Sequence, residues 1–325
     1  MNNPVKVKLN PRKTFWKCGA CSRAMFHLLN HEFENIKPEE EKAADLLAGG
    51  IAMKGYQCGM LWGAALAIGV ESFRRYNNSN ETTAAVEAPN EDSIRIGSNK
   101  SDINEATAVA IISSRHLVAS FRHSAGTVNC RDITKVDWEK KSHFIIFLLK
   151  TIAQGFVFSP CFKFIEKWTP EAIQTANTGL SERIEQKEFS LCSSGASEEW
   201  RSDNQPCLSC ATEVLKKMGA SNEASVTVAG LAGGIGLSGN GCGALSAVIW
   251  YKMLEWGKIN PGKTPEMFNN PTVKSILKSF NAQTGSEMLC SKICGRTFAT
   301  MKEHTEYLQT GGCRKLLEEL AKEEC

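Results

Sequence analysis

The sequence predicts an all-α fold of two repeated helical domains, each with a glycine-rich turn that leads into a helix capped by a cysteine. One observation is a segment that occurs twice, as residues 47–61 and 231–245, with nine identical positions at a constant offset of 184. Similarity at a fixed offset indicates that one structural unit is used twice. The other observation is that apolar residues recur at helical spacing. No stretch shows the alternation of Val, Ile, Thr and aromatic residues that is typical of strands.

In the first half, the helices can be placed in chain order. We expect a helix over residues 21–30, where Met25, Leu28 and Leu29 share a face. A second helix, over residues 38–49, has acidic residues in its first turn, as the helix dipole favours. The glycine turn then leads into further helices, which are expected over residues 58–75, 105–123 and 143–154, the last of them mostly buried.

Within residues 58–75, Gly59, Gly63 and Ala67 recur every four positions. Residues at this spacing share one helical face, so a second helix could approach closely there. Close packing is the simpler interpretation of this stripe. The alternative is that the backbone approaches a cofactor.

The second half repeats the plan, with helices expected over residues 210–218, 242–256, 272–280 and 313–324. We therefore place the first repeat at residues 1–177 and the second at 206–325. Residues 178–205 are rich in Ser, Glu and Asn and are predicted to be a linker. Residues 76–104 are polar, have no counterpart in the second half, and are predicted to be an inserted loop.

Eight cysteines keep the same order in the two halves. The first-half set is Cys21, Cys58, Cys130 and Cys161, and the second-half set is Cys210, Cys242, Cys290 and Cys313. Cys18 and Cys207 precede the first member of each set in a CxxC pair. Three cysteines have no counterpart in the other half: Cys192, Cys294 and Cys325.

This order of cysteines around a Cys-Gly-Ala-x-x-Gly segment resembles the C_GCAxxG_C_C family of redox-active proteins. Residues 58–63 carry the motif with Met60 in place of Ala, and residues 242–247 carry it with Ala247 in place of the last Gly. Residues 129–134 resemble the family's signature around its third cysteine, which is altered around Cys290. The resemblance covers roughly residues 15–175 and 205–325. It implies redox activity, and it implies no particular reaction.

Cys58 and Cys242 are the candidate redox-active thiols, because each lies where the glycine-rich turn enters a helix. Backbone N–H groups and the helix dipole at that position are expected to lower the pKa of the thiol and favour the thiolate. The alternative interpretation is that each is a buried cysteine acting as a small apolar residue.

Four soft sulfur ligands in each half suit an iron–sulfur cluster or zinc. Cys18 and Cys207 are additional candidate ligands, because a CxxC pair can reach one ion. We therefore expect a redox protein, and a candidate oxidoreductase, that either binds a cluster and transfers electrons or exchanges thiols and disulfides with an unidentified electron donor or acceptor. The alternative is a non-enzymatic protein whose cysteines bind zinc or are structural, with no redox cofactor.

The amino-acid composition limits the kinds of binding partner that we expect for this protein. The 38 basic and 35 acidic residues are interleaved and give a net charge of +3, so no nucleic-acid partner is expected. The N-terminus is not followed by an apolar run, and we expect a cytoplasmic protein. Patterned cysteines are then metal ligands or catalytic groups rather than disulfides. Residues 46–70 and 225–251 are nearly free of charge, yet their glycines predict short buried helices around a turn, so membrane insertion is not expected.

Overall fold

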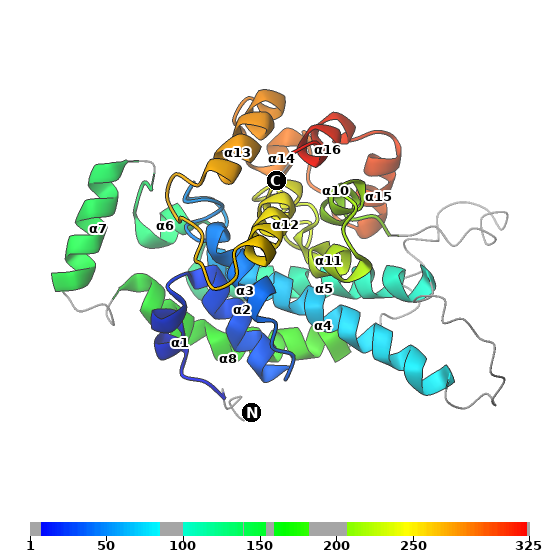
Figure 1. The fold of residues 1–325 in the computed structure, drawn as a ribbon, viewed down its shortest axis with the longest axis horizontal. Helices are drawn as coiled ribbons and strands as arrows, with labels where there is room; N and C mark the ends of the chain where they lie inside the picture. The colour runs from blue at the N-terminus through cyan, green and yellow to red at the C-terminus, as the bar shows by residue number, and fades with distance from the viewer. Residues whose placement is uncertain (1–7, 85–99, 139, 154–158, 182–206, 324–325) are drawn as a thin grey trace.

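The all-α prediction is confirmed. The computed structural model describes residues 8–84, 100–138, 140–153, 159–181 and 207–323. Every regular element within these ranges is a helix, and two isolated β-bridges are the only extended pairings there (Figure 1). No helix in the described part of the chain is long and apolar enough to cross a membrane.

The first half forms a bundle around one long helix. Its elements are α1 (Pro11–Cys18), α2 (Cys21–Glu32), α3 (Pro38–Ala43), the 3-10 helix η1 (Ala44–Leu47), α4 (Gly59–Ala84), α5 (Lys100–Ala125), α6 (Cys130–Thr134), α7 (Lys141–Ala153) and α8 (Pro160–Ser181). Helix α4 packs against α2 and α5, and α5 packs in turn against α8.

From α10 onward, the second half repeats the order of elements that the first half shows from α2 onward, around a shorter central helix. Its elements are α10 (Cys210–Lys217), α11 (Asn222–Thr227), the 3-10 helix η4 (Ala229–Leu231), α12 (Gly243–Ile259), α13 (Pro271–Thr284), α14 (Cys290–Ile293), α15 (Met301–Gln309) and α16 (Arg314–Ala321). Helix α12 packs against α10, and α16 packs against α10 and α13.

Short polar side chains begin several of these helices and explain where they start. The side chain of Asn270 accepts a hydrogen bond from the Val273 N–H at 3.1 Å, and Pro271 occupies the first position of α13. Ser209 and Thr300 act in the same way before α10 and α15. Such caps satisfy N–H groups that have no partner inside the helix.

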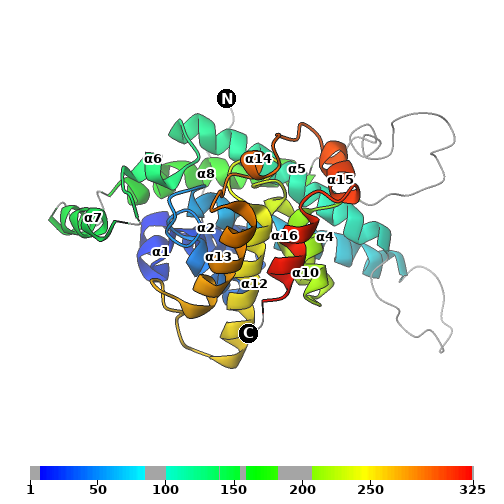
Figure 2. The same cartoon turned by 90° about the horizontal axis from the view of Figure 1, so that it is seen from above.

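The two halves share one hydrophobic core. Helix α4 contacts α11, α3 contacts α12, and α5 contacts η4. The largest cluster of buried side chains includes Trp62 and Trp168 of the first half with Trp250 of the second. The indole N–H of Trp250 donates to the Glu40 carbonyl at 3.0 Å, across the boundary. The repeats are therefore packed face to face (Figures 1 and 2).

The small-residue stripe of α4 is used for close packing. A Cβ atom at Gly63 would overlap the carbonyl oxygen of Ser22 in α2, and one at Gly59 would overlap the sulfur of Cys21. At Gly69, which lies outside the stripe, a Cβ atom would overlap the carbonyl oxygen of Thr227 in α11. The same helix thus touches its own half on one side and the second half on another. The packing interpretation of the stripe is confirmed.

Helix α7 differs from the prediction. It was expected to be mostly buried, yet Ile145, Ile146, Leu149 and Ile152 are between 49% and 60% exposed. The helix itself forms where the apolar run predicts it. It stands apart from the body in both views, so the expectation of burial was wrong (Figures 1 and 2). An apolar run predicts a helix but does not reveal whether a neighbour covers it.

The two predicted irregular segments are partly helical. Helix α4 continues to Ala84 and α5 begins at Lys100, so both ends of the predicted loop 76–104 are helix, and residues 85–99 lie outside the described residues. Helix α8 continues to Ser181, into the predicted linker 178–205. The rest of that linker also lies outside the described residues.

Candidate redox site

The glycine-rich turn has the same left-handed backbone in both halves. All five residues of 49–53 and all five of 233–237 have positive φ angles, between 48° and 82°. Ile51 and Ile235, which are β-branched, are outliers in this region. Strained backbone that recurs at equivalent places points to a functional constraint.

This turn holds the second and third cysteines of each half together. The N–H of Cys130 donates to the Tyr56 carbonyl at 2.7 Å, and the N–H of Cys290 donates to the equivalent Asn240 carbonyl at 2.9 Å. The Cys58 N–H donates to the carbonyl of Val128 at 2.8 Å. Residues far apart in the sequence are therefore positioned by backbone bonds and not only by side-chain packing.

The four first-half cysteines come together at the starts of four helices. Cys21, Cys130 and Cys161 lie at the first turns of α2, α6 and α8. Cys58 directly precedes α4, and the other three sulfurs are close enough to raise its pKa by their charge. We call Cys21, Cys58, Cys130 and Cys161 the first cluster.

Burial dominates the electrostatics of the first cluster. The pKa of the Cys58 thiol is raised well above its usual value, first by burial and then by the other cysteines, and the Met60 N–H opposes this only in part. Burial raises the pKa of Cys130 to about 12, although side-chain hydrogen bonds from Trp138 and Thr134 lower it. The expected lowering of the Cys58 pKa was wrong, because burial destabilises the thiolate more than the helix N-terminus stabilises it.

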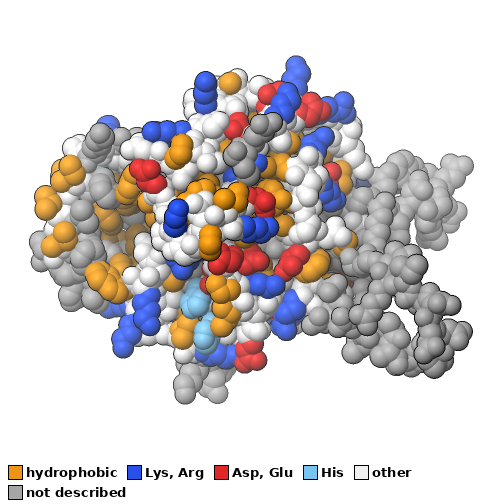
Figure 3. Space-filling view, in the orientation of Figure 1, with side chains coloured by type: hydrophobic (Ala, Val, Ile, Leu, Met, Phe, Trp, Pro, Cys, Tyr) orange, Lys and Arg blue, Asp and Glu red, His pale blue; other side chains and the backbone are white. Residues whose placement is uncertain are grey.

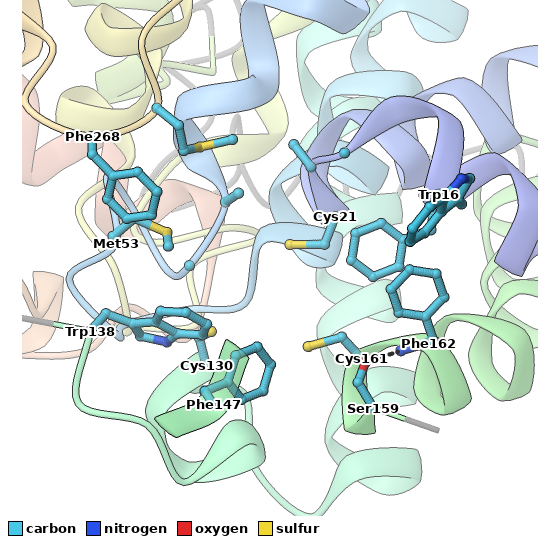
Figure 4. A pocket seen from close by; sticks show the side chains of 16 residues that line it. Trp16, Cys21, Met53, Cys130, Trp138, Phe147, Ser159, Cys161, Phe162 and Phe268 are labelled. Atoms are coloured by element: carbon cyan, nitrogen blue, oxygen red, sulfur yellow. Dashed lines mark hydrogen bonds between the residues drawn. The ribbon is translucent and has the colours of Figure 1, made fainter. Parts of the chain in front are cut away.

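A cavity of about 410 Å³ opens beside this cluster and exposes three of its cysteines to the same space. Figure 4 shows the sulfurs of Cys21 and Cys161 pointing into the space between two groups of aromatic side chains. Trp16 and Phe162 lie on one side, and Trp138 and Phe147 lie on the other. The first cluster is therefore accessible to a small molecule.

The second-half cysteines also come together, with one addition. Cys210, Cys242, Cys290 and Cys313 line one small cavity together with Cys294. The Cys294 sulfur lies 3.8 Å from that of Cys290 and 3.7 Å from that of Cys313. We call these five residues the second cluster.

Cys294 was not predicted as a site residue, because it has no cysteine counterpart in the first half. Its place, four residues after the third cysteine, is taken there by Thr134. The spacing of four from Cys290 is the signal that could have revealed it, because residues four apart in a helix face the same side.

The second cluster is tightly packed, since the cavity among its sulfurs measures about 10 Å³, roughly the space of one water molecule. Two of its members, Cys294 and Cys313, are nevertheless partly exposed. Burial raises the pKa of Cys242 to about 12, so the expected lowering was wrong here too. The pKa of Cys313 is raised further, first by its hydrogen bond with Cys294 and then by burial.

The two CxxC partners, Cys18 and Cys207, line neither of the two cavities beside the clusters. The groups that shift the pKa of Cys18 are burial, Arg23, Asp45 and Glu41 rather than other cysteines. Cys207 is disulfide-bonded and packs in a separate apolar cluster with Phe298 and Met301. The role of Cys18 and Cys207 as supporting ligands therefore stays a prediction.

The first cluster has the chemistry of a thiolate ligand set. Four cysteine sulfurs gathered at the starts of four helices are the donor type that iron–sulfur clusters and zinc prefer. Within the described ranges, no group of three or more His, Cys, Asp and Glu side chains is placed to hold a metal ion as it stands. The five sulfurs of the second cluster enclose too little space for a polynuclear cluster.

One family model matches both halves of the chain, over residues 20–167 and 207–323. Its description is "Putative redox-active protein (C_GCAxxG_C_C)". The two matched segments contain the two cysteine clusters and agree with a tandem duplication. No curated protein and no solved structure matches the chain.

Proposed function

Because this chain belongs to the C_GCAxxG_C_C family, whose description is of redox activity, we propose that its first cluster carries electrons as the ligand set of an iron–sulfur centre. The observation that supports this proposal is the convergence of four cysteines, three buried and Cys161 half-buried, whose pKa values are all raised. A cationic centre would bind them as thiolates.

The residues around the sulfurs would tune such a centre. Hydrogen bonds to coordinating sulfurs and the exclusion of water are the means by which proteins set the reduction potential of iron–sulfur centres. The N–H groups of Met60 and Gly49 point at Cys58 and Cys21, and Trp138 and Thr134 lower the pKa of Cys130. An iron–sulfur centre supplies one-electron chemistry when it is bound.

The deciding experiment is iron and acid-labile sulfide analysis of protein purified without oxygen, combined with visible absorbance. We expect iron and sulfide in comparable amounts, and their loss in Cys58→Ser. Cys18→Ser is the matched control and should keep both, because Cys18 lies outside the cluster. Zinc without sulfide would support the non-redox alternative, and the absence of both iron and sulfide would refute the cluster.

A specific observation favours a second function for the second cluster, namely thiol–disulfide exchange. Cys294 lies within 3.8 Å of two other sulfurs in a cavity with no room for a larger group. Oxidation would break two S–H bonds and form one S–S bond, and two electrons and two protons would pass to an external disulfide, which is reduced to two thiols. We expect that a mild disulfide oxidant links Cys294 to Cys290 or Cys313, as peptide mass mapping would detect. If Cys294→Ser loses as many thiols on oxidation as the unaltered protein, this role is wrong.

A further inference from the structure

We propose that the cavity beside the first cluster is a binding site for an uncharged aromatic small molecule. That such a molecule is the electron partner of the chain rests on the proposed function, whereas its binding does not. The cavity of about 410 Å³ falls within the range of small-molecule sites, which are concave and mostly apolar.

Aromatic rings form two opposite walls of this cavity. Phe15 and Phe162 are stacked with their ring centroids 4.4 Å apart, and both line it. On the other side, Trp138 and Phe147 meet edge to face at 5.2 Å. Rings favour stacked and edge-to-face contacts with other rings, so a flat aromatic ligand could contact both walls. The sulfurs of Cys21 and Cys161 would face such a ligand (Figure 4).

The lining also predicts that the ligand carries no charge. Among the described residues, no Lys, Arg, His, Asp or Glu side chain lines the cavity. A charged ligand would lose its water there without gaining an ionic partner, which is costly. A neighbouring surface groove of the same half is different, since it is lined by Lys135, Lys163 and Lys167 together with Asp132. The absence of charged lining is therefore a property of this cavity and not of the whole first half.

The mouth of the cavity exposes large apolar side chains. Trp16 is 60% exposed and Phe268, contributed by the second half, is 42% exposed. Both line the cavity, and hydrophobic side chains gather on the side of the molecule where α7 stands (Figure 3). Exposed apolar residues that cluster around a cavity, rather than being scattered, are typical of binding sites.

The test is a fluorescence titration of the full-length, metal-free protein with N-phenyl-1-naphthylamine, an uncharged aromatic dye that brightens in apolar sites. We expect saturable binding of one dye per chain, and displacement by tetramethyl-1,4-benzoquinone, a flat and uncharged conjugated ring whose hydroquinone form is aromatic. Anilinonaphthalene sulfonate, its charged relative, should bind at least tenfold more weakly. Equal affinity for the charged and uncharged dyes would overturn the proposal.

Two variants test whether the dye binds in this cavity, and neither is expected to disrupt folding. Trp16→Ala and Phe268→Ala remove exposed side chains, so their effect on folding should be small, and each should raise the dissociation constant about fivefold or more. Phe73→Ala removes a half-buried aromatic residue of α4 that does not line the cavity, and it should leave the dissociation constant unchanged. Identical dissociation constants in all four proteins would place the dye elsewhere and refute the site.

The outcomes separate this inference from the proposed function. Dye binding is measured without metal, so a chain that lacks iron and sulfide can still bind the dye. A chain that contains iron but binds no dye refutes only the ligand site. If the protein alone sediments as a dimer and binds dye only after dissociation by dilution, a second copy occupies the cavity and the small-molecule proposal fails.

Discussion

Ala52 holds a left-handed conformation, with φ of 48°, in a turn whose second copy has Gly236 at the equivalent place. A left-handed backbone costs a non-glycine residue about 1–2 kcal/mol, and glycine avoids this cost. We predict that Ala52→Gly raises the free energy of unfolding by about 1 kcal/mol, measured by denaturant titration. The turn of the first half is thus expected to be the more strained copy.

The reverse substitution provides the control. In Gly236→Ala, the added Cβ would overlap the backbone nitrogen of Arg115, in addition to the conformational cost. We expect a clear loss of stability there. If both variants destabilise the protein, relief of strain is not what distinguishes the two turns.

Asp45 is a second residue whose energetics can be tested. Burial raises its pKa from the ordinary 3.8 to about 7, although Arg23, at 3.7 Å, opposes the shift. Between these pH values the folded protein binds more protons than the unfolded chain, so the free energy of unfolding falls as pH rises. The stabilising effect of the proton is complete below about pH 3.8 and is lost as pH rises through about 7.

Asp45→Asn removes this dependence, because the amide stays neutral. We predict that the variant is more stable than the natural chain near pH 8, by up to about 4 kcal/mol, and close to it near pH 4. Thermal or denaturant unfolding at the two pH values measures the difference. A stability difference that does not change with pH would show that Asp45 ionises as freely in the folded protein as in the unfolded chain.

At the scale of elements, local signals were sufficient for most of the fold. The helix predicted over residues 242–256 is α12, because the glycine turn and the apolar run that follows it are both local. Helix α15 was not predicted, since its sequence is mostly polar. Its start was nevertheless marked: Thr300 accepts from the Glu303 N–H, and the Glu303 side chain accepts from the N–H of Ala299. This arrangement is close to a capping box.

The site could be predicted only as far as the duplication reached. Matching the halves grouped Cys21, Cys58, Cys130 and Cys161 correctly in space, because equivalent residues of a repeat occupy equivalent places. Cys294 has no cysteine counterpart in the first half, so comparing the halves did not identify it as a site residue. The aromatic walls could not be predicted, because residues as distant as Phe15 and Phe268 meet only through tertiary packing.

At the scale of the whole molecule, the two halves have similar backbones, but their cysteine clusters differ in how much free space lies beside them. Gln57 joins them, accepting from the Gly241 N–H at 3.2 Å and donating to the Ser238 hydroxyl at 3.3 Å. Gln57 and Gly241 are equivalent residues of the two turns, directly before Cys58 and Cys242. The turns that carry the central cysteines therefore touch, yet the first cluster lines a cavity of about 410 Å³ and the second, among the residues that the structure describes, one of about 10 Å³.

This difference in access predicts unequal roles for the central cysteines. An external electron acceptor can approach the first cluster through the aromatic cavity, whereas the second cluster has almost no free space. We predict that Cys58→Ser slows electron transfer from the reduced protein to tetramethyl-1,4-benzoquinone at least tenfold, measured by stopped-flow absorbance. Cys242→Ser should keep at least about half of the rate, provided that circular dichroism shows both variants folded. Equal losses would mean that electrons pass through both clusters in series, and the open cavity would then not determine which cluster meets the acceptor.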